Sequence, residues 1–540
     1  MEKRSFVAGA AVLAAAGLLV KFIGAVYHIP LANLVGVDAM RYYDIVYRYY
    51  TWLLVISSAG LPTAISKLVS ERVTLGDYKG GRQVFKTAFR LLLLVGIFTS
   101  LFMYFGADLL SGISYPKDAS LEIAKQALSF RALAPALLFV SLMCAYRGYL
   151  QGMQQMTGTA VSQIAEQLFK LAAGFALAKL LLKYGPEYAA MGALIGVSIS
   201  ELFALIIIFV FYIRRRQRFI EPQSTQKFQT SSLPISRQIL MIAVPVTIGA
   251  SVMPLTGILD SALIIRTLEG IGYSVEAAGE AYSLLYSYVT RVINMPAVLT
   301  VALAMSLVPA ISSYTAKKEF RLVKSAALTG MKLALIIGTP CAVGLYVLAE
   351  PILGMLYSSL TKVQLSVASD LMRTACVGVV FLSLVQALTG VIQGLGKPYV
   401  PVINLVFGGF LKVVTLLVLM RRPEINIQGA AVSTVVCYGT AGILDIVYLV
   451  RKTGLRLNIF DVFIKPIASS ALMGLAVYAL YAFLIAHISP TLATLIAVML
   501  GVALYAAAFI GLRMLNTEDL AFIPGGSRLK ALMGQPKRKR

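Results

Sequence analysis

The chain has 540 residues, of which 59% are apolar and only 13% are charged, and its mean hydropathy is +0.81. Soluble globular proteins carry about 25% charged residues and disordered chains lack apolar residues, so both classes are excluded. The net charge of +24 would suggest nucleic acid as a partner of a soluble protein. In a membrane protein it fits the basic bias of cytoplasmic loops, and we expect no nucleic-acid partner.

About fourteen apolar stretches are long enough to cross a bilayer, since a spanning helix needs about 20 such residues. In chain order the predicted spans cover 6–27, 42–68, 86–110, 124–150, 157–183, 188–213, 238–266, 280–311, 325–347, 366–393, 399–420, 428–450, 463–486 and 489–512. Lys and Arg gather in every second loop and in the tail. The positive-inside rule therefore predicts an all-α, multi-pass protein with both termini in the cytoplasm.

Two segments of the chain resemble each other at an offset of 242 residues. Ser141–Gly152 and Ser383–Gly394 share Ser, Leu, Ala, Gly, Gln and Gly in register, and Lys170 falls on Lys412. We interpret this as a parallel pseudo-twofold repeat of two six-helix lobes, the build of a transporter with its site between two halves. The predicted parts are an N-lobe (1–213), a cytoplasmic linker (214–237), a C-lobe (238–452), two additional helices (453–513) and a basic cytoplasmic tail (514–540).

Ionisable side chains within the predicted spans are candidate functional groups, because a charge at the centre of a span costs about 2.5–3.5 kcal/mol. Arg291 lies mid-span in Tyr288-Val-Thr-Arg-Val-Ile-Asn-Met-Pro296, and Asp260 lies at a similar depth in the neighbouring span. We expect Asp260 to neutralise Arg291 until an anionic ligand competes for it. Glu166 and Lys170 are four residues apart and can pair along one helix.

Two other charges suggest structural roles. We interpret Arg147, near a cytoplasmic end, as reaching back to the membrane surface. We interpret Asp445 as the partner of Arg451 near the same face.

The deep charges are mostly basic. A cavity lined by Lys and Arg attracts an anion, and the planar guanidinium group suits phosphate, whereas a proton or sodium pathway would be rich in acids. We therefore expect an anionic headgroup to bind at Lys21, His28, Arg48 and Arg291. The expected supporting or gating ion pairs involve Asp260, Glu166, Lys170 and Lys412.

The sequence contains no recognisable catalytic or metal-binding pattern. Two histidines, His28 and His487, are too few for common triads or metal sites, and the four cysteines stand singly. The stretch from Gly390 to Lys397 lacks the spacing and the Ser or Thr of a phosphate loop. We expect no enzymatic activity, no metal and no cofactor. Active transport would draw on the membrane potential or on a monovalent cation.

Five stretches of the chain are distinctive in sequence: Lys21-Phe-Ile-Gly-Ala-Val-Tyr-His-Ile-Pro-Leu31, Ala59-Gly-Leu-Pro-Thr-Ala-Ile-Ser-Lys67, Tyr149-Leu-Gln-Gly-Met-Gln-Gln-Met-Thr157, Ser162-Gln-Ile-Ala-Glu-Gln167 and the run from Arg291 to Pro309-Ala-Ile-Ser312. They resemble the MurJ/SpoVB-type polysaccharide flippases of Gram-positive bacteria, which belong to the multidrug/oligosaccharidyl-lipid/polysaccharide exporter superfamily. The resemblance covers nearly the whole chain.

The resemblance implies two lobes around a V-shaped cavity, with a lipid-tail groove at the two additional helices. It implies a bacterial plasma membrane protein that binds membrane lipids and a lipid-linked sugar, and that can work as a monomer. The implied activity moves lipid II from the inner to the outer leaflet by alternating access, with cavity arginines holding the pyrophosphate. Arg291 matches the family's essential arginine and Lys21 a first-span basic position, but relatives carry an arginine at Tyr27 or His28.

Other functions stay open at this point. The nearest is a flippase for another polyprenyl-linked oligosaccharide, such as an exopolysaccharide unit or a spore-cortex precursor. A cation-coupled drug exporter of the same superfold would have a cavity dominated by acidic residues. A membrane-embedded glycosyltransferase or polymerase would need a catalytic carboxylate near a large outer loop, whereas the predicted outer loops are short.

Overall fold

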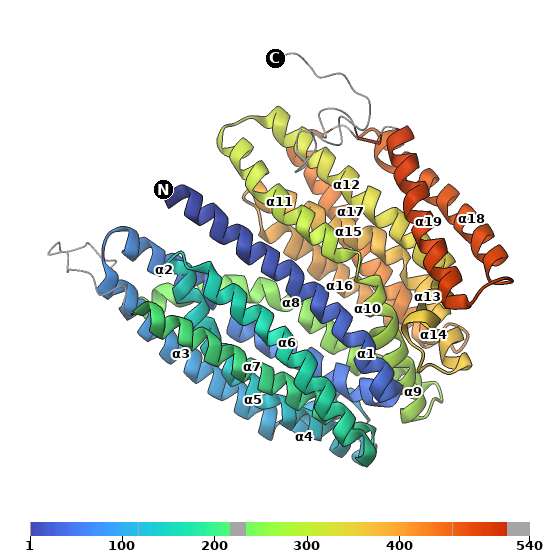
Figure 1. Cartoon of the computed structure of the whole chain (residues 1–540), viewed down its shortest axis with the longest axis horizontal. Helices are drawn as coiled ribbons and strands as arrows, with labels where there is room; N and C mark the ends of the chain where they lie inside the picture. The colour runs from blue at the N-terminus through green and yellow to red at the C-terminus, as the bar shows by residue number, and fades with distance from the viewer. Residues whose placement is uncertain (1, 117, 217–233, 456, 513, 516–540) are drawn as a thin grey trace. The chain divides into compact units, whose positions relative to one another are not determined.

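The computed structural model describes residues 2–116, 118–216, 234–455, 457–512 and 514–515. Over these residues it is helical throughout, without a strand (Figure 1), which confirms the predicted all-α fold. The helices of the first half are α1 (Glu2–Ser58), α2 (Leu61–Thr74), α3 (Tyr78–Phe105), α4 (Ala107–Ser114), α5 (Ser120–Gly152), α6 (Met156–Leu181), α7 (Pro186–Arg216), α8 (Ile235–Gly270) and α9 (Val275–Ser283). They are followed by α10 (Thr290–Ile293), α11 (Ala297–Ala316), α12 (Phe320–Val347), α13 (Ala349–Leu356), α14 (Lys362–Ala375), α15 (Val377–Gly394), α16 (Tyr399–Met420), α17 (Gln428–Thr453), α18 (Lys465–Leu484) and α19 (Pro490–Gly511).

Twelve helical stretches of the described chain are long and apolar enough to cross a membrane. The first, Ala15–Thr74, is 60 residues long and its helix α1 is kinked at Gly36, where φ is +77°. Because about 20 residues suffice for one crossing, this stretch is long enough for two. Helix α6, with 26 residues, is outside the twelve because Glu166 and Lys170 make it less apolar. These two features account for the difference from the predicted fourteen, and the chain is a multi-pass membrane protein.

Large apolar side chains are exposed on many of these helices, among them Phe98 and Phe105 on α3 and Leu472 and Leu475 on α18. Exposed apolar surface of this extent would be a liability in water. In a bilayer it is the surface that faces lipid, so the exposure pattern agrees with the membrane assignment.

The chain forms two compact units, Met1–Ser283 and Leu284–Arg540. The boundary falls between α9 and α10, and α8 packs against α1, α2 and α3 within the first unit. Residues 217–233 of the predicted linker and 516–540 of the predicted tail lie outside the described residues. The predicted division into lobes at 214–237 therefore stays a prediction.

Helix boundaries recur in the second unit at the offset seen in the sequence. Helices α3 and α12 begin at residues 78 and 320 and end at 105 and 347, a constant offset of 242. Helices α4 and α13 follow the same offset, beginning at 107 and 349 and ending at 114 and 356. Helices α7 and α17 begin at 186 and 428. These boundaries confirm the parallel repeat that Ser141–Gly152 and Ser383–Gly394 predicted.

The repeat also preserves a close approach between helices. A Cβ atom on Gly148 would lie 3.0 Å from the carbonyl oxygen of Pro62 on α2 and 2.9 Å from the Cβ of Ile65. A Cβ atom on Gly390 would lie 2.7 Å from the carbonyl oxygen of Ala304 on α11. Small residues let helix backbones pack closely in membranes, where water does not drive association. Equivalent glycines therefore allow α5 to pack closely on α2 in one unit and α15 to pack closely on α11 in the other.

We expect Gly148→Ala to lower the free energy of unfolding by about 1–3 kcal/mol, because the added methyl group overpacks this contact. Thermal unfolding of the purified protein in detergent would measure the effect. Gly112→Ala is a matched control, since a Cβ atom there meets only the Cδ1 of Ile123, at 4.0 Å. Equal melting temperatures for the two variants would contradict the close packing of α2 on α5.

Candidate functional site

Charged side chains are buried in the first unit along α1 and the helices packed on it. Six of them are less than a tenth exposed: His28, Arg41, Asp44, Glu122, Glu201 and Asp260. Burying a charge costs several kcal/mol unless it is paired and hydrogen-bonded, so the partners of these groups decide what each can do.

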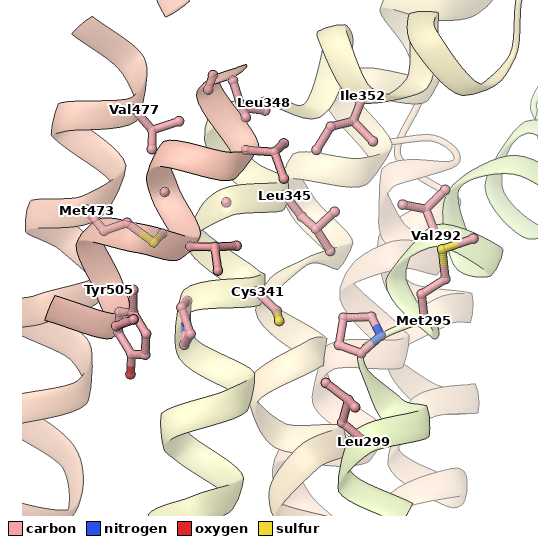
Figure 2. A pocket seen from close by; sticks show the side chains of 18 of the residues that line it. Val292, Met295, Leu299, Cys341, Leu345, Leu348, Ile352, Met473, Val477 and Tyr505 are labelled. Atoms are coloured by element: carbon pink, nitrogen blue, oxygen red, sulfur yellow. The ribbon is translucent and has the colours of Figure 1, made fainter. Parts of the chain in front are cut away.

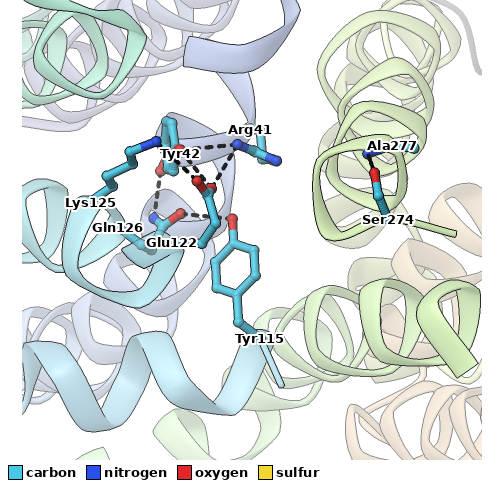
Figure 3. A network of polar contacts seen from close by, with 8 residues as sticks. All are labelled: Arg41, Tyr42, Tyr115, Glu122, Lys125, Gln126, Ser274 and Ala277. Carbon is cyan, nitrogen blue, oxygen red and sulfur yellow. Dashed lines mark hydrogen bonds and ion pairs between the residues drawn. The ribbon is translucent and has the colours of Figure 1, made fainter. Parts of the chain in front are cut away.

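Arg41 and Glu122 form the centre of a polar network between α1 and α5 (Figure 3). Arg41 Nη2 donates to Glu122 Oε2 over 2.8 Å, and the Tyr42 hydroxyl donates to the same oxygen over 2.7 Å. Lys125 Nζ lies 3.1 Å from Glu122 Oε1, and Gln126 Nε2 donates to the carbonyl oxygen of Tyr42 over 2.9 Å. Arg41, Tyr42 and Lys125 all donate to the Glu122 carboxylate. We therefore interpret the network as a structural contact that holds α1 against α5 rather than as an open binding site.

The predicted headgroup residues of α1 lie in the same unit. His28 Nε2 lies 3.6 Å from Asp44 Oδ1, so this histidine has a carboxylate beside it. Arg48 is half-buried, donates from Nη1 to the carbonyl oxygen of Gly257 on α8 over 3.3 Å, and lies with its Cζ 5.6 Å from the centre of the Tyr282 ring. Lys21 belongs to α1, but its side chain lies outside the described part of the structure.

Arg147 pairs with Glu166 across two helices. Arg147 Nη2 donates to Glu166 Oε2 over 3.0 Å, and Nε and Nη2 donate to Ser162 Oγ over 3.2 and 3.1 Å. The Arg147 side chain is 14% exposed, so the prediction that it reaches back to the membrane surface is wrong. Glu166 is thereby neutralised by α5 rather than by Lys170 of its own helix, because the contact between α5 and α6 adds hydrogen bonds to the ion pair.

Lys170 lies instead among tyrosines. Its Nζ donates to the Tyr47 hydroxyl over 2.9 Å and lies 4.6 and 5.7 Å from the ring centres of Tyr47 and Tyr27. On α7, Glu201 accepts a hydrogen bond from the Tyr50 hydroxyl over 3.3 Å. Sequence reasoning missed Glu201, although a single acid inside the apolar run 188–213 was a signal for it.

In the second unit, Arg291 lies on a broken helix. It belongs to the short α10, between the π-helical turn η3 (Leu284–Val289) and Pro296, and it is partly exposed. Irregular backbone at membrane depth is tolerated where it lines a cavity, and π-turns are frequent at functional sites. Arg291 and Asp260 belong to different units, and the neutralisation of one by the other stays a prediction.

Three other charges of the second unit lie deep. Lys332 on α12 and Lys412 on α16 are 4% and 6% exposed. Asp445 is fully buried and accepts a hydrogen bond from Asn404 Nδ2 over 2.7 Å, while Arg451 is exposed. The predicted pair between Asp445 and Arg451 is therefore wrong, because α16 supplies a neutral partner inside the bundle. Across the described residues, no group of three or more His, Cys, Asp or Glu side chains is placed to hold a metal ion.

A cavity of about 740 Å³ lies in the second unit. Figure 2 shows side chains from α18 and α19 on one side of it and side chains from the α10–α11 region on the other: Met473, Val477 and Tyr505 opposite Val292, Met295 and Leu299. Helices α12 and α13 contribute further lining residues, nearly all of them apolar, with Cys341 among them. Val292, at one edge, directly follows Arg291 in the chain. The lining of the apolar groove thus includes a residue that neighbours a cation in the chain.

Residues 6–315, more than half of the chain, match the family described as "Polysaccharide biosynthesis protein". The chain belongs to this family. Residues 285–418 also match the MatE family. Family membership confirms the resemblance to MurJ/SpoVB-type proteins of the exporter superfamily.

Individual relatives agree with this assignment. The chain is 26% identical over 481 residues to the lipid II flippase MurJ of Bacillus subtilis (strain 168), covering 87% of each chain. It is 26% identical over 436 residues to stage V sporulation protein B of the same organism, covering 81% of this chain and 82% of that one. The solved structure "Lipid II flippase MurJ, inward closed conformation" shares its fold, with a TM-score of 0.69, 16% identity and coverage of 93% of this chain and 99% of that one. The flippases and transporters among these similar proteins are not enzymes, in agreement with the prediction for this chain.

Proposed function

We propose that this protein moves lipid II, a peptidoglycan precursor linked to undecaprenyl pyrophosphate, from the inner to the outer leaflet of the bacterial plasma membrane. The observation that carries this proposal is the apolar groove of the second unit, whose lining includes Val292, the residue that follows Arg291 in the chain. A polyprenyl-linked sugar needs both features, because its tail must stay in an apolar environment while its phosphates must be neutralised. The similarity to a relative named as a lipid II flippase supports the same substrate class.

In this proposal the groove beside α18 and α19 holds the polyprenyl tail, which thereby avoids the cost of about 0.8 kcal/mol that each CH₂ group would incur in water. Arg291 of the second unit and Lys21, His28 and Arg48 of the first unit contact the pyrophosphate as the two lobes alternate between inward- and outward-facing states. Both termini lie in the cytoplasm in this proposal. An inside-negative membrane potential favours outward movement of the anionic headgroup, by about 2.3 kcal/mol per charge per 100 mV. A monovalent cation gradient is the other candidate energy source, and the working unit is a monomer.

A flippase for another polyprenyl-linked oligosaccharide is the second candidate. It is favoured by the equal identity, 26%, to stage V sporulation protein B, and a spore-cortex precursor or an exopolysaccharide unit would be its substrate. The same groove and cations would serve it, because these features recognise the lipid and the phosphates rather than the sugar.

Alkylation of Cys341 tests whether the groove binds the tail. Cys341 lines the groove and is partly exposed, whereas Cys144, Cys376 and Cys437 are buried. We expect undecaprenyl pyrophosphate, at ten times its dissociation constant, to slow alkylation by a small apolar maleimide about tenfold, as mass action requires of a blocked site. Inorganic pyrophosphate lacks a tail and should leave the rate unchanged.

Cys341→Ser provides the control, since it should remove the protected label and leave only the slow background of the three buried thiols. If saturating undecaprenyl pyrophosphate leaves the alkylation rate of Cys341 unchanged, the tail lies elsewhere.

A further inference from the structure

Lys170 is a cation inside the first unit with a neutral partner. Its contacts are the Tyr47 hydroxyl, at 2.9 Å, and the faces of the Tyr47 and Tyr27 rings. Over the described residues no carboxylate pairs with it, because Glu166, four residues away on the same helix, is held by Arg147. Lys170 therefore makes no direct ion pair among the described residues, and the nearby acid Glu201 interacts with it only at longer range.

The two tyrosines that contact Lys170 both carry hydroxyl groups that can donate a hydrogen bond. The Tyr47 oxygen accepts the hydrogen bond from Lys170, and its own O–H finds no acceptor in the part of the chain that the structure describes. The Tyr27 side chain is 3% exposed, and its hydroxyl likewise has no partner among the described residues. A buried hydroxyl without a partner is costly, so the Tyr27 O–H near an ammonium group calls for an acceptor that the described residues do not supply.

Helix packing brings the Tyr27 hydroxyl close to the backbone of α6. A Cβ atom on Gly174 would lie 2.5 Å from the Tyr27 hydroxyl oxygen, so only glycine leaves room for it. Gly174 follows Lys170 by four residues, which places both on one face of α6. The ammonium group and the Tyr27 hydroxyl thus lie against the same helix face, and Lys170 is partly exposed. Cation–π contacts offset only part of the cost of an ammonium group in a membrane, so an anion can supply the remainder.

We propose that Lys170, with the hydroxyls of Tyr27 and Tyr47, forms a further anion-binding subsite that takes phosphate oxygens of the transported lipid. This inference rests on the proposed function and replaces the supporting ion pair with Glu166 that the sequence suggested. Phosphate oxygens accept several hydrogen bonds at once, and lysine binds phosphate as a point charge. Free pyrophosphate offers the same chemistry as the lipid headgroup, and the experiment distinguishes the two.

The test compares Lys170→Met with Lys179→Met in the purified full-length protein. Lys179 lies on the same helix and is exposed, which makes it a matched control. Titration with inorganic pyrophosphate and with undecaprenyl pyrophosphate should show about tenfold weaker binding of both ligands to Lys170→Met, as expected for loss of a charge-assisted hydrogen bond. Lys179→Met should bind both ligands like the wild type.

Tyr27→Phe separates a binding role from a structural one. It removes a hydroxyl without a partner, so its melting temperature should equal or exceed that of the wild type while both ligands bind more weakly. Wild-type affinity in Lys170→Met, or weaker binding of inorganic pyrophosphate alone, would overturn the subsite. If Lys170→Met weakens both ligands but the wild type moves no lipid, the proposed function fails and the subsite stands.

Discussion

Arg291→Ala should reduce translocation of the lipid-linked substrate by about 10–100-fold, the loss expected when a hydrogen bond to a charged group worth about 1.5–3 kcal/mol is removed. Arg291 directly precedes the groove residue Val292 in the chain, and its planar guanidinium group can hold two phosphate oxygens at once. Arg291→Lys keeps the charge and loses the planar group, so its rate should be intermediate. The rates would be measured in proteoliposomes that contain equal amounts of monodisperse protein.

Arg373→Ala is the matched control for Arg291→Ala. Arg373 is an arginine of the same unit whose side chain is 41% exposed and pairs with Asp370 on α14. Its loss should leave translocation unchanged. Wild-type transport by Arg291→Ala would remove Arg291 from the headgroup site.

Glu122→Ala should lower the free energy of unfolding by about 3–5 kcal/mol, because it leaves the Arg41 guanidinium group buried without its counter-charge. The two side chains are only 4% and 8% exposed, and Tyr42 and Lys125 also lose their shared acceptor. Denaturation of the purified protein in detergent would measure the change. Replacing Arg41 by Met in the same chain should recover much of the loss, since the unpaired charge is then gone.

Asp108→Ala is the control that measures how much burial adds to the loss of unfolding free energy when an ion pair is broken. Asp108 and Arg131 pair over 2.7 Å, close to the 2.8 Å of Arg41 and Glu122, but their side chains are 59% and 40% exposed. An exposed pair contributes about 0–1 kcal/mol, so Asp108→Ala should have little effect. Equal destabilisation by Asp108→Ala and Glu122→Ala would mean that the buried network does not hold α1 against α5.

The repeat could be predicted from the sequence because packing constrains the residues that carry it. Gly148 and Gly390 each leave no room for a Cβ atom against a neighbouring backbone. Residues under such a steric limit stay recognisable in both copies, whereas lipid-facing positions need only be apolar. The all-helical fold followed from hydropathy for a related reason, since every backbone group in a bilayer must be paired within the protein.

Side-chain partners could not be predicted from the sequence. Arg41 and Asp44 lie where a loop and the start of the second span were expected, but α1 continues through them as a kinked helix. Spacing along α6 suggested that Glu166 pairs with Lys170, while helix packing gives it Arg147. Hydropathy reports whether a helix enters the membrane, and the partners of its polar groups depend on which helices pack together.

The apolar groove of the second unit could not be predicted from its residues alone. The apolar composition of α18 and α19 fits helices that face only lipid, and nothing in their residues distinguishes Met473 and Val477 as lining a cavity. The resemblance to an exporter family supplied that expectation. Its physical basis is visible only in the packing of α12 and α13 against the two additional helices.

Translocation of lipid II by the wild-type protein in proteoliposomes is the most direct test of the proposed function. A second polyprenyl-linked oligosaccharide with a different sugar would be measured in parallel, each with and without an inside-negative membrane potential. We expect protein-dependent movement of lipid II that is faster with the potential. If folded, monodisperse protein moves the second substrate but not lipid II under either condition, the proposed substrate is wrong, and if it moves neither, so is the proposed flippase activity.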